Sequence, residues 1–323
     1  MPRELHLSVA LDGTSHRPTD PAHRADLIGL AEQGALDFVT VGTAPDAGPG
    51  PYGTVAALTR ATSLSSRIGL VPTVTTTGTQ PHDTFSALAA LDAVSEGRAG
   101  WLVDVADTAP EAEADVWAEA VAATGTTARL WDGRTGDADT GGTTDRALGT
   151  GAVVPRAPQG RPPVAVALDV HDSDGPWELA AYHADVVLLD AEQPAVVRLA
   201  RAALLGRAAE AGRDPDALRV LVRVAVDLGG TGAPPPADTL RFSGAAADLG
   251  RLLAEWHGAG GADGFHLLTA SALADLRAVV GDLVPALRRH GLFRARYTGR
   301  TLRDHIGLPR PARRSVRDPE SAV

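Results

Sequence analysis

The sequence predicts a (β/α)8 barrel, and two observations support that fold class. Short aliphatic runs alternate with Ala-rich segments of helical length, and eight such strand–helix pairs can be counted along the 323 residues. The first of these runs leads into Leu11–His16, which lacks the G-x-G-x-x-G turn of a doubly wound dinucleotide-binding sheet. Eight units without that turn favour a closed barrel over an open sheet.

The predicted strands are runs dominated by β-branched and aliphatic residues, which suit a sheet buried on both faces. In chain order they are Leu5–Ala10, Phe38–Val41, Arg67–Thr75, Trp101–Val105, Pro163–Ala167, Val186–Leu189, Leu218–Val226 and Gly264–Leu268. Most are flanked on at least one side by Gly, Pro, Asp or Ser, the residues that end strands and begin turns.

The helices between these strands are rich in Ala, Leu, Glu and Arg, which have high helix propensity. In chain order they are Ala22–Gly34, Val55–Ser63, Asp83–Val94, Pro110–Leu130, Glu178–His183, Pro194–Ala211, Ala245–Gly258 and Leu273–His290. Glycine follows several of them, for example Gly97 and Gly212, as expected just beyond the end of a helix.

Three stretches have no apolar period. Asp132–Gly160 is rich in Gly, Thr and Asp and is predicted as an extended loop after strand four, and Gly229–Ala237 as an extended loop after strand seven. Arg310–Val323 carries four Arg among Pro, Ser and Asp. We therefore expect a single barrel domain over residues 1–309 and a flexible, Arg-rich tail over 310–323.

The composition excludes several classes of chemistry. Cys, Lys and Asn are all absent, which rules out disulfides, thiol nucleophiles, P-loop lysines, Schiff-base lysines and N-glycosylation. Acidic residues outnumber basic ones by 40 to 30, so we expect no binding to nucleic acid or to an anionic membrane surface. No apolar run is long enough to span a bilayer and no signal peptide is evident, so we expect a cytoplasmic protein.

Histidines on the predicted loops after strands are the candidate catalytic residues, because the chemistry of a barrel takes place at the C-terminal ends of its strands. His16 follows the first strand and His82 the third, where an imidazole could serve as general acid or base. His266, at the end of the eighth strand, is a third candidate. No H-x-H or H-E-x-x-H spacing occurs, so no metal site is predicted.

Several junctions, taken in order, resemble one family. The motifs are Leu36–Val41 at strand two, Ser66–Thr77 at strand three, LDAVSEGRAGW at 91–101, Leu130–Asp132, Pro158–Pro162 and Arg289–Phe293. The sequence is similar to the bacterial-luciferase-like flavin-dependent monooxygenases, and most similar to the branch that contains nitrilotriacetate and desulfurisation monooxygenases. The resemblance extends over nearly the whole chain.

The resemblance implies a homodimeric barrel enzyme that uses reduced FMN, supplied by a separate NAD(P)H:flavin reductase, and O2 to oxidise a small organic substrate. It implies hydroxyl contacts to the flavin from the end of strand three and a phosphate-binding loop after strand five. The matching positions, with Asp104 added because it lies in the junction at the C-terminal end of strand four, are Thr73, Thr75, Thr76, Asp104, Ser173 and Gly175. The dimer interface is expected on Val55–Ser63 and Asp83–Val94.

Two alternatives stay open. The loop after strand five also contains Asp169, Asp172 and Asp174, which would repel a phosphate, and apolar residues such as Leu102 and Val105 stand where the family usually has polar ones. One alternative is a barrel that has lost its cofactor or its catalysis, and binds flavin or a partner subunit. The other is a dehydrogenase that uses a deazaflavin and transfers hydride without O2.

Overall fold

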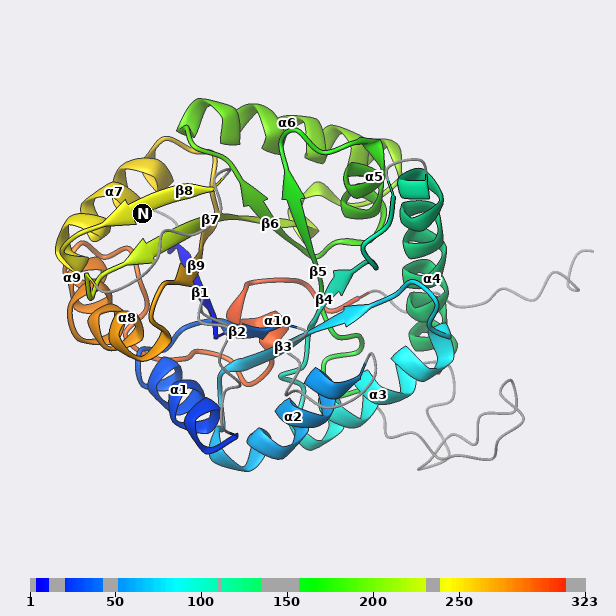
Figure 1. Ribbon diagram of the computed structural model, residues 1–323, viewed down its shortest axis with the longest axis horizontal. Coiled ribbons are helices and arrows are strands. Elements are labelled where there is room, and N and C mark those ends of the chain that lie inside the picture. The colour runs from blue at the N-terminus through cyan, green and yellow to red at the C-terminus, as the bar shows by residue number, and fades with distance from the viewer. Residues whose placement is uncertain are drawn as a thin grey trace, which may run out of the picture.

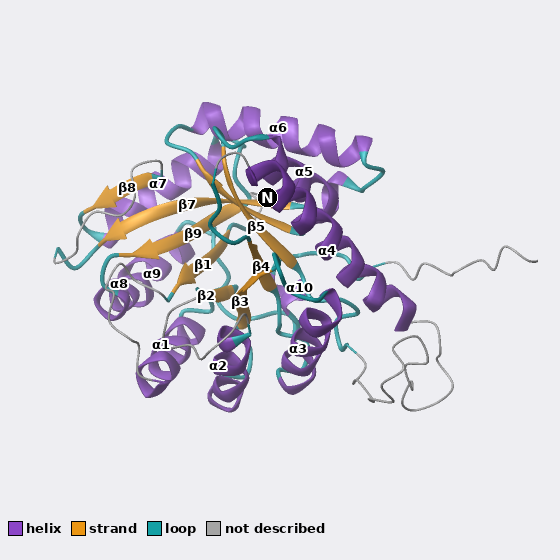
Figure 2. Cartoon of the chain, turned by 45° about the vertical axis from the view of Figure 1, so that its right-hand side comes forward, coloured by secondary structure: helices purple, strands orange, loops and turns teal. Residues whose placement is uncertain are grey.

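A computed structural model of the chain describes residues 4–11, 21–42, 52–109, 112–134, 157–230 and 239–311. In these residues a ring of parallel strands is surrounded by helices, as Figure 1 shows in a view into the barrel. Figure 2 shows the same helices lying outside the strands. The predicted (β/α)8 barrel is confirmed.

Eight parallel strands form the closed barrel. They are β1 (His6–Ala10), β2 (Phe38–Val41), β3 (Gly69–Thr75), β4 (Trp101–Asp104), β5 (Val164–Asp169), β6 (Val186–Asp190), β7 (Arg219–Asp227) and β9 (Gly264–Thr269). β9 pairs with both β1 and β7, and the pairing of β6 with β7 closes the ring. All eight predicted strands are present, shifted by at most a few residues at their ends.

The helices between the strands cover the outer face of the barrel. They are α1 (Pro21–Gln33), α2 (Gly53–Ala61), α3 (Pro81–Val94), α4 (Glu113–Arg134), α5 (Asp174–His183), α6 (Pro194–Glu210), α7 (Ala246–Gly258), α8 (Ala272–Ala278) and α9 (Val284–Arg289). The last predicted helix is interrupted by a π-helical turn over Val279–Leu283. Pro285, which follows the turn and has no backbone N–H, cannot make the regular i→i−4 bond.

Alternate strand residues face opposite sides, so each strand contributes to two cores. Leu7 and Val9 of β1 pack in the core between strands and helices, whereas Ser8 between them points into the barrel. The N-terminal end of the barrel is filled by a second cluster in which Phe38 and Leu221 pack against Leu302. Leu302 begins the short helix α10 (Leu302–His305), which lies across that end of the barrel (Figure 1).

Two predictions about the connections need correction. Only residues 105–112 separate β4 from α4, so the expected extended loop does not follow strand four but connects α4 to β5. The helix continues past its predicted end because Trp131 packs edge-on against Phe85 of α3, with ring centroids 4.5 Å apart. Most of this connection, residues 135–156, lies outside the described residues.

The second correction is an additional strand, β8 (Leu240–Ser243), which the sequence did not predict. It pairs in parallel with Val224–Asp227, the end of β7, which continues beyond its pairing with β6. Most of the predicted loop after strand seven lies outside the described residues, which lack 231–238, and so do residues 312–323 of the predicted tail. No helix in the described ranges is both long and apolar enough to cross a membrane.

Candidate active site

The C-terminal ends of the strands carry a group of inward-facing polar side chains, here called the acidic rim: Thr75, Asp104, Asp169, Asp190 and Arg223. Thr75 Oγ1 donates a hydrogen bond of 3.0 Å to Asp104 Oδ2 across the β3–β4 pair. Asp169 and Asp190 lie side by side, as partners in the β5–β6 register. Three neighbouring strands therefore each end in a carboxylate at the barrel mouth.

One arginine partly balances these carboxylates. Arg223 Nη1 donates to Asp190 Oδ2 at 2.6 Å, and Thr239 Oγ1 donates to the other oxygen of the same carboxylate, also at 2.6 Å. Burial raises the pKa of Asp190, and the neighbouring Asp169 adds to the rise, against the opposing effects of Arg223 and Thr239. The rim is thus a place where negative charge is already in excess.

Below the rim, a buried histidine forms a polar floor inside the barrel. His266 Nδ1 forms a hydrogen bond of 2.9 Å with Ser8 Oγ, and His266 Nε2 forms one of 3.3 Å with Thr40 Oγ1. Which ring nitrogen donates depends on the tautomer of the imidazole. Burial, reinforced by Arg223, lowers the pKa of His266 to about 3, so the imidazole is neutral at physiological pH. His266 lies within β9 and is 2% exposed, so its predicted place at the strand end was wrong.

The threonines after β3 hold the ends of β3 and β4 together. Thr76 Oγ1 donates to the carbonyl of Asp104 at 3.1 Å, and the Ala106 N–H donates to Thr77 Oγ1 at 2.7 Å. Thr73 is buried, and its carbonyl accepts a hydrogen bond from Thr54. Of the residues expected to contact flavin, the structure thus places Thr73, Thr75, Thr76 and Asp104 in one region.

Comparison with known proteins identifies the family. The family model for luciferase-like monooxygenases matches residues 1–283 of this chain. The chain belongs to the luciferase-like monooxygenase family. This makes it a flavin-dependent oxidoreductase, and the predicted family is confirmed.

The chain is also similar to individual known proteins. Nitrilotriacetate monooxygenase component A from Aminobacter aminovorans is 26% identical over 92% of each chain. Among solved structures, EDTA monooxygenase from Chelativorans sp. BNC1 superposes with a TM-score of 0.78, at 19% identity over 95% of this chain and 99% of that one. A long-chain alkane monooxygenase superposes with a TM-score of 0.76, at 16% identity over 95% and 96% of the two chains. These two structures share the barrel fold.

In the described residues, neither of the predicted catalytic histidines, His16 and His82, contacts a residue of the acidic rim. His16 lies outside the described residues. His82 is in the first turn of α3, where its Nδ1 lies 3.6 Å from Asp83 Oδ1, a partner on the same turn. In the part of the chain that the structure describes, no three metal-ligating side chains are grouped so as to hold a metal ion.

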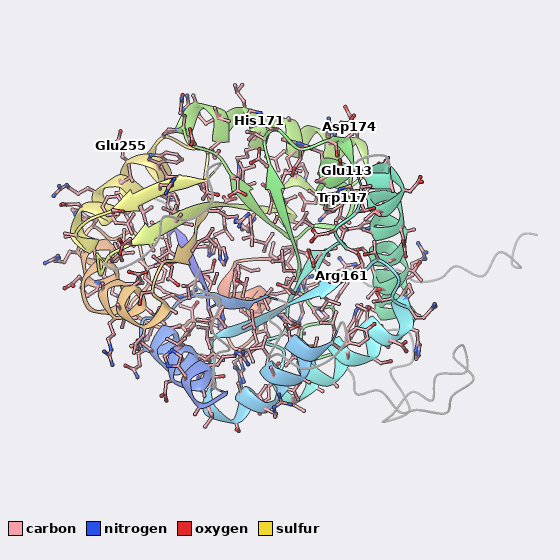
Figure 3. All side chains as sticks on the ribbon, viewed as in Figure 1. Glu113, Trp117, Arg161, His171, Asp174 and Glu255 are labelled. Carbon is pink, nitrogen blue, oxygen red and sulfur yellow. The ribbon has the colours of Figure 1, made fainter. Side chains whose placement is uncertain are left out.

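The loop between β5 and α5, where the resemblance implies a phosphate-binding loop, does not have the side-chain contacts of a phosphate site. Ser173, the expected phosphate ligand, donates its hydroxyl hydrogen to Glu113 Oε1 at 2.8 Å instead. Figure 3 shows where Glu113, Trp117 and Asp174 come together between α4 and α5. Burial raises the pKa of Asp172 in the same loop, and the carboxylates of Asp169 and Glu113 raise it further.

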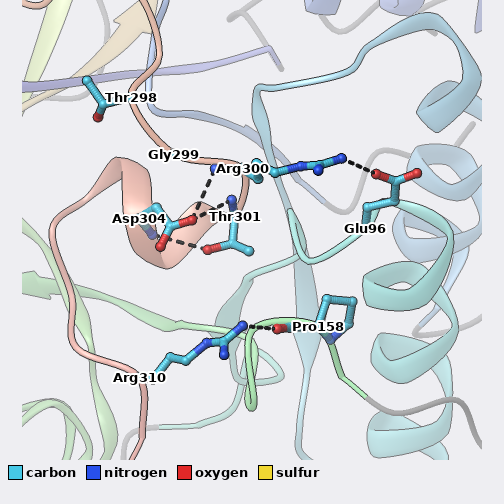
Figure 4. A pocket seen from close by; sticks show the side chains of 8 residues that line it. All are labelled: Glu96, Pro158, Thr298, Gly299, Arg300, Thr301, Asp304 and Arg310. Atoms are coloured by element: carbon cyan, nitrogen blue, oxygen red, sulfur yellow. Dashed lines mark hydrogen bonds and ion pairs between the residues drawn. The ribbon is translucent and has the colours of Figure 1, made fainter.

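A hollow of about 680 Å³ lies at the opposite, N-terminal end of the barrel, beside α10 (Figure 4). Its lining residues are Glu96, Pro158, Thr298, Gly299, Arg300, Thr301, Asp304 and Arg310. Arg300 pairs with Glu96 at 3.5 Å, and Thr301 and Asp304 form the capping box of α10. These contacts serve the local structure, as expected at the stability end of a barrel.

Two residues of the site were missed from the sequence, Arg223 and Glu113. Arg223 interrupts the aliphatic run of β7, and a charged residue inside a buried strand was a usable signal for a group facing the barrel interior. Glu113 lies in the first turn of α4, where acidic residues are common because they interact favourably with the helix dipole. Nothing in the local sequence therefore indicated that Glu113 contacts the loop between β5 and α5. That contact depends on how α4 packs against α5.

Proposed function

We propose that this chain is the oxygenating component of a two-component monooxygenase. Reduced flavin, FMN in the family's usual form, is supplied by a separate NAD(P)H:flavin reductase, and O2 and a small organic substrate complete the reaction. The observation that carries the proposal is the family match over residues 1–283. The relative aligned over 92% of this chain is itself named as one component of a monooxygenase.

The chain's own residues have a limited and specific task in this proposal. Thr75 and Asp104, joined by their 3.0 Å hydrogen bond, present a polar edge to the flavin ring, and Thr73 and Thr76 fix the backbone beside it. The reduced flavin supplies the chemistry with O2, so no protein nucleophile is needed. This agrees with a chain that contains neither Cys nor Lys.

The proposal includes a homodimer that associates through the outer ends of α2 and α3. Leu64, just after α2, is 62% exposed, and Val94, the last residue of α3, is 53% exposed. Large apolar side chains exposed at the ends of neighbouring helices are consistent with a contact surface. These two helices are the ones on which the resemblance places the interface.

Anaerobic titration tests the proposal directly. The purified protein is titrated with photoreduced FMN and photoreduced riboflavin and then mixed with O2, while light scattering gives the molar mass of the same sample. We expect at least one reduced flavin to bind with a micromolar Kd, and its reoxidation on the protein to differ in rate from that of free flavin. Binding of neither flavin would contradict the proposal and leave a barrel without its cofactor. A reduced deazaflavin is titrated in the same way, and its binding in the absence of any binding of FMN or riboflavin would favour the dehydrogenase.

A matched pair of variants locates the binding region. Thr75→Val removes the hydroxyl that Asp104 accepts from, and we expect it to weaken binding of the reduced flavin about tenfold. Thr126→Val is the control, because the Thr126 hydroxyl bonds only to the carbonyl of Ala122 in its own helix and to Arg129 among the described contacts. Equal affinities of both variants and the wild type would remove Thr75 from the site.

A further inference from the structure

The loop between β5 and α5 has the position of an anion site, but several of its backbone donors are already used. The Asp169 N–H donates to Asp172 Oδ2, and the His171 N–H donates to Asp169 Oδ1, each at 2.7 Å. The side chains that accept these bonds are the carboxylates of Asp172 and Asp169, which place negative charge within the loop itself. Backbone amides that would otherwise attract an anion are therefore occupied by the loop's own carboxylates.

The first turn of α5 is also a poor phosphate cradle. Ser173 is the residue before the helix, and its hydroxyl is directed to Glu113 at 2.8 Å rather than to the helix N-terminus. Pro176, in the first turn, has no N–H to donate. Two of the groups that usually bind a phosphate at a helix N-terminus are thus unavailable.

Gly175, in this turn, makes room for a neighbouring helix rather than for a ligand. A Cβ atom at Gly175 would lie only 2.5 Å from Cβ and 2.7 Å from Cγ of Trp117. Gly175 is therefore the residue that lets α4 pack directly onto the start of α5. That packing brings Glu113, one turn before Trp117 on the same helix, over the loop (Figure 3).

We propose that Glu113 acts as a specificity-determining residue that excludes a phosphate from the β5–α5 loop, so the flavin that this barrel accepts carries an uncharged tail there, as riboflavin does. The carboxylate of Glu113 accepts the hydrogen bond of the Ser173 hydroxyl, which is then no longer available to a phosphate. Together with Asp169 and Asp172 it opposes a dianion by like-charge repulsion. Arg207, a nearby cation, is engaged by Asp174 at 3.1 Å. This inference rests on the proposed function, because it concerns the flavin that the proposed enzyme would bind.

The experiment compares two flavins that differ only in the phosphate. Kd values for photoreduced FMN and photoreduced riboflavin are measured anaerobically on the full chain. For the wild type, we expect riboflavin to bind at least as tightly as FMN. For Glu113→Gln, we expect FMN to bind about tenfold more tightly than to the wild type, with the Kd of riboflavin unchanged.

Three controls separate this effect from a structural one. Glu255→Gln removes one carboxylate from the exposed surface of α7, far from the loop (Figure 3), and should change neither Kd. Asp172→Asn removes a second carboxylate from the loop and should shift FMN binding in the same direction as Glu113→Gln, even if the latter variant folds poorly. Added salt should tighten FMN binding to the wild type more than to Glu113→Gln, since it screens the repulsion.

The outcomes are distinguishable. FMN binding tenfold more tightly than riboflavin to the wild type would overturn the inference and leave the proposed function intact. The same holds if neither Glu113→Gln nor Asp172→Asn changes the ratio of the two Kd values. Binding of neither flavin to any variant would overturn both the inference and the proposed function.

Discussion

The two ends of the barrel use the same acidic residue type in opposite ways. At the N-terminal end, Asp37 and Asp185 are fully buried and each is matched by one arginine, Arg294 at 2.9 Å and Arg303 at 3.0 Å. At the C-terminal end, the acidic rim holds three aspartates and one arginine, Arg223, which pairs with the buried Asp190, whereas Asp104 and Asp169 are partly exposed. One end is neutralised internally, and the other carries an excess of negative charge.

The pKa values follow this difference. Burial alone would raise the pKa of Asp185, but Arg303, Arg161 and the Val164 N–H together hold it below its ordinary value. At the other end, burial and Asp169 raise the pKa of Asp190 despite its arginine. The paired charges of Asp37 and Asp185 therefore stabilise the fold, whereas at the mouth the charged form of Asp190 is disfavoured by its surroundings, as is common at sites that bind ligands.

The largest expected effect is a loss of stability at the N-terminal end. Asp185→Asn leaves the Arg303 guanidinium, 3% exposed, without its counter-charge, and we expect the free energy of unfolding to fall by about 3–5 kcal/mol. The same substitution at the mouth, Asp104→Asn, should cost about 1 kcal/mol or less, because Thr75 can still donate to the amide oxygen. Urea denaturation followed by circular dichroism measures both.

The relative size of these two stability losses shows whether the two ends of the barrel differ as described. If Asp104→Asn destabilised the protein as much as Asp185→Asn, the rim would be a structural network like the one at the N-terminal end. If neither substitution changed the free energy of unfolding, the stability of the protein would depend on paired charge at neither end.

A second prediction uses pH at the N-terminal end. Burial raises the pKa of Asp92 from 3.8 to about 7, against the hydrogen bond from Gln159 Nε2 at 2.6 Å. Asp92 Oδ2 is buried and makes no hydrogen bond within the described residues, so the protonated acid is the better fit. Between about pH 4 and pH 7 the folded chain keeps a proton that the unfolded chain has lost.

Stability from this group is therefore lost as the pH rises through that range, by up to about 4 kcal/mol at about 1.4 kcal/mol per pK unit. Asp92→Asn cannot titrate, so its stability relative to the wild type should increase from pH 5 to pH 8. Thermal unfolding of both proteins at several pH values checks this. A constant difference across the range would mean that Asp92 does not change its protonation there.

The smallest expected effect concerns the packing of α4 on α5 near the mouth. Gly175→Ala places a Cβ against Trp117, and we expect a loss of about 1–3 kcal/mol in the free energy of unfolding. Gly206→Ala in α6 is the matched control, since no atom lies within 4 Å of its added Cβ, and it should gain up to about 1 kcal/mol. Equal and small effects would mean that α4 shifts easily and that Glu113 is not held over the loop.

Much of the barrel could be predicted from the sequence because each strand–helix unit is encoded locally. Aliphatic runs such as Val186–Asp190 and Ala-rich helices such as α6 identify themselves by composition and length. The extra strand β8 escaped prediction because it is short, half exposed and stabilised by pairing with β7, which lies outside its own sequence.

The candidate site divides in the same way. The sequence by itself determined the barrel, the family resemblance, the place of Thr75 and Asp104 near strand ends and the place of Ser173 in the loop after β5, because the alternation of aliphatic runs and turns locates each strand end to within a few residues. Only the tertiary structure decided their partners: Asp104 for Thr75, Glu113 for Ser173 and Trp117 for Gly175. Each partner lies on another element than the residue it contacts, β4 for Asp104 and α4 for both Glu113 and Trp117. Contacts between elements depend on how strands and helices pack in the barrel, which no local pattern records.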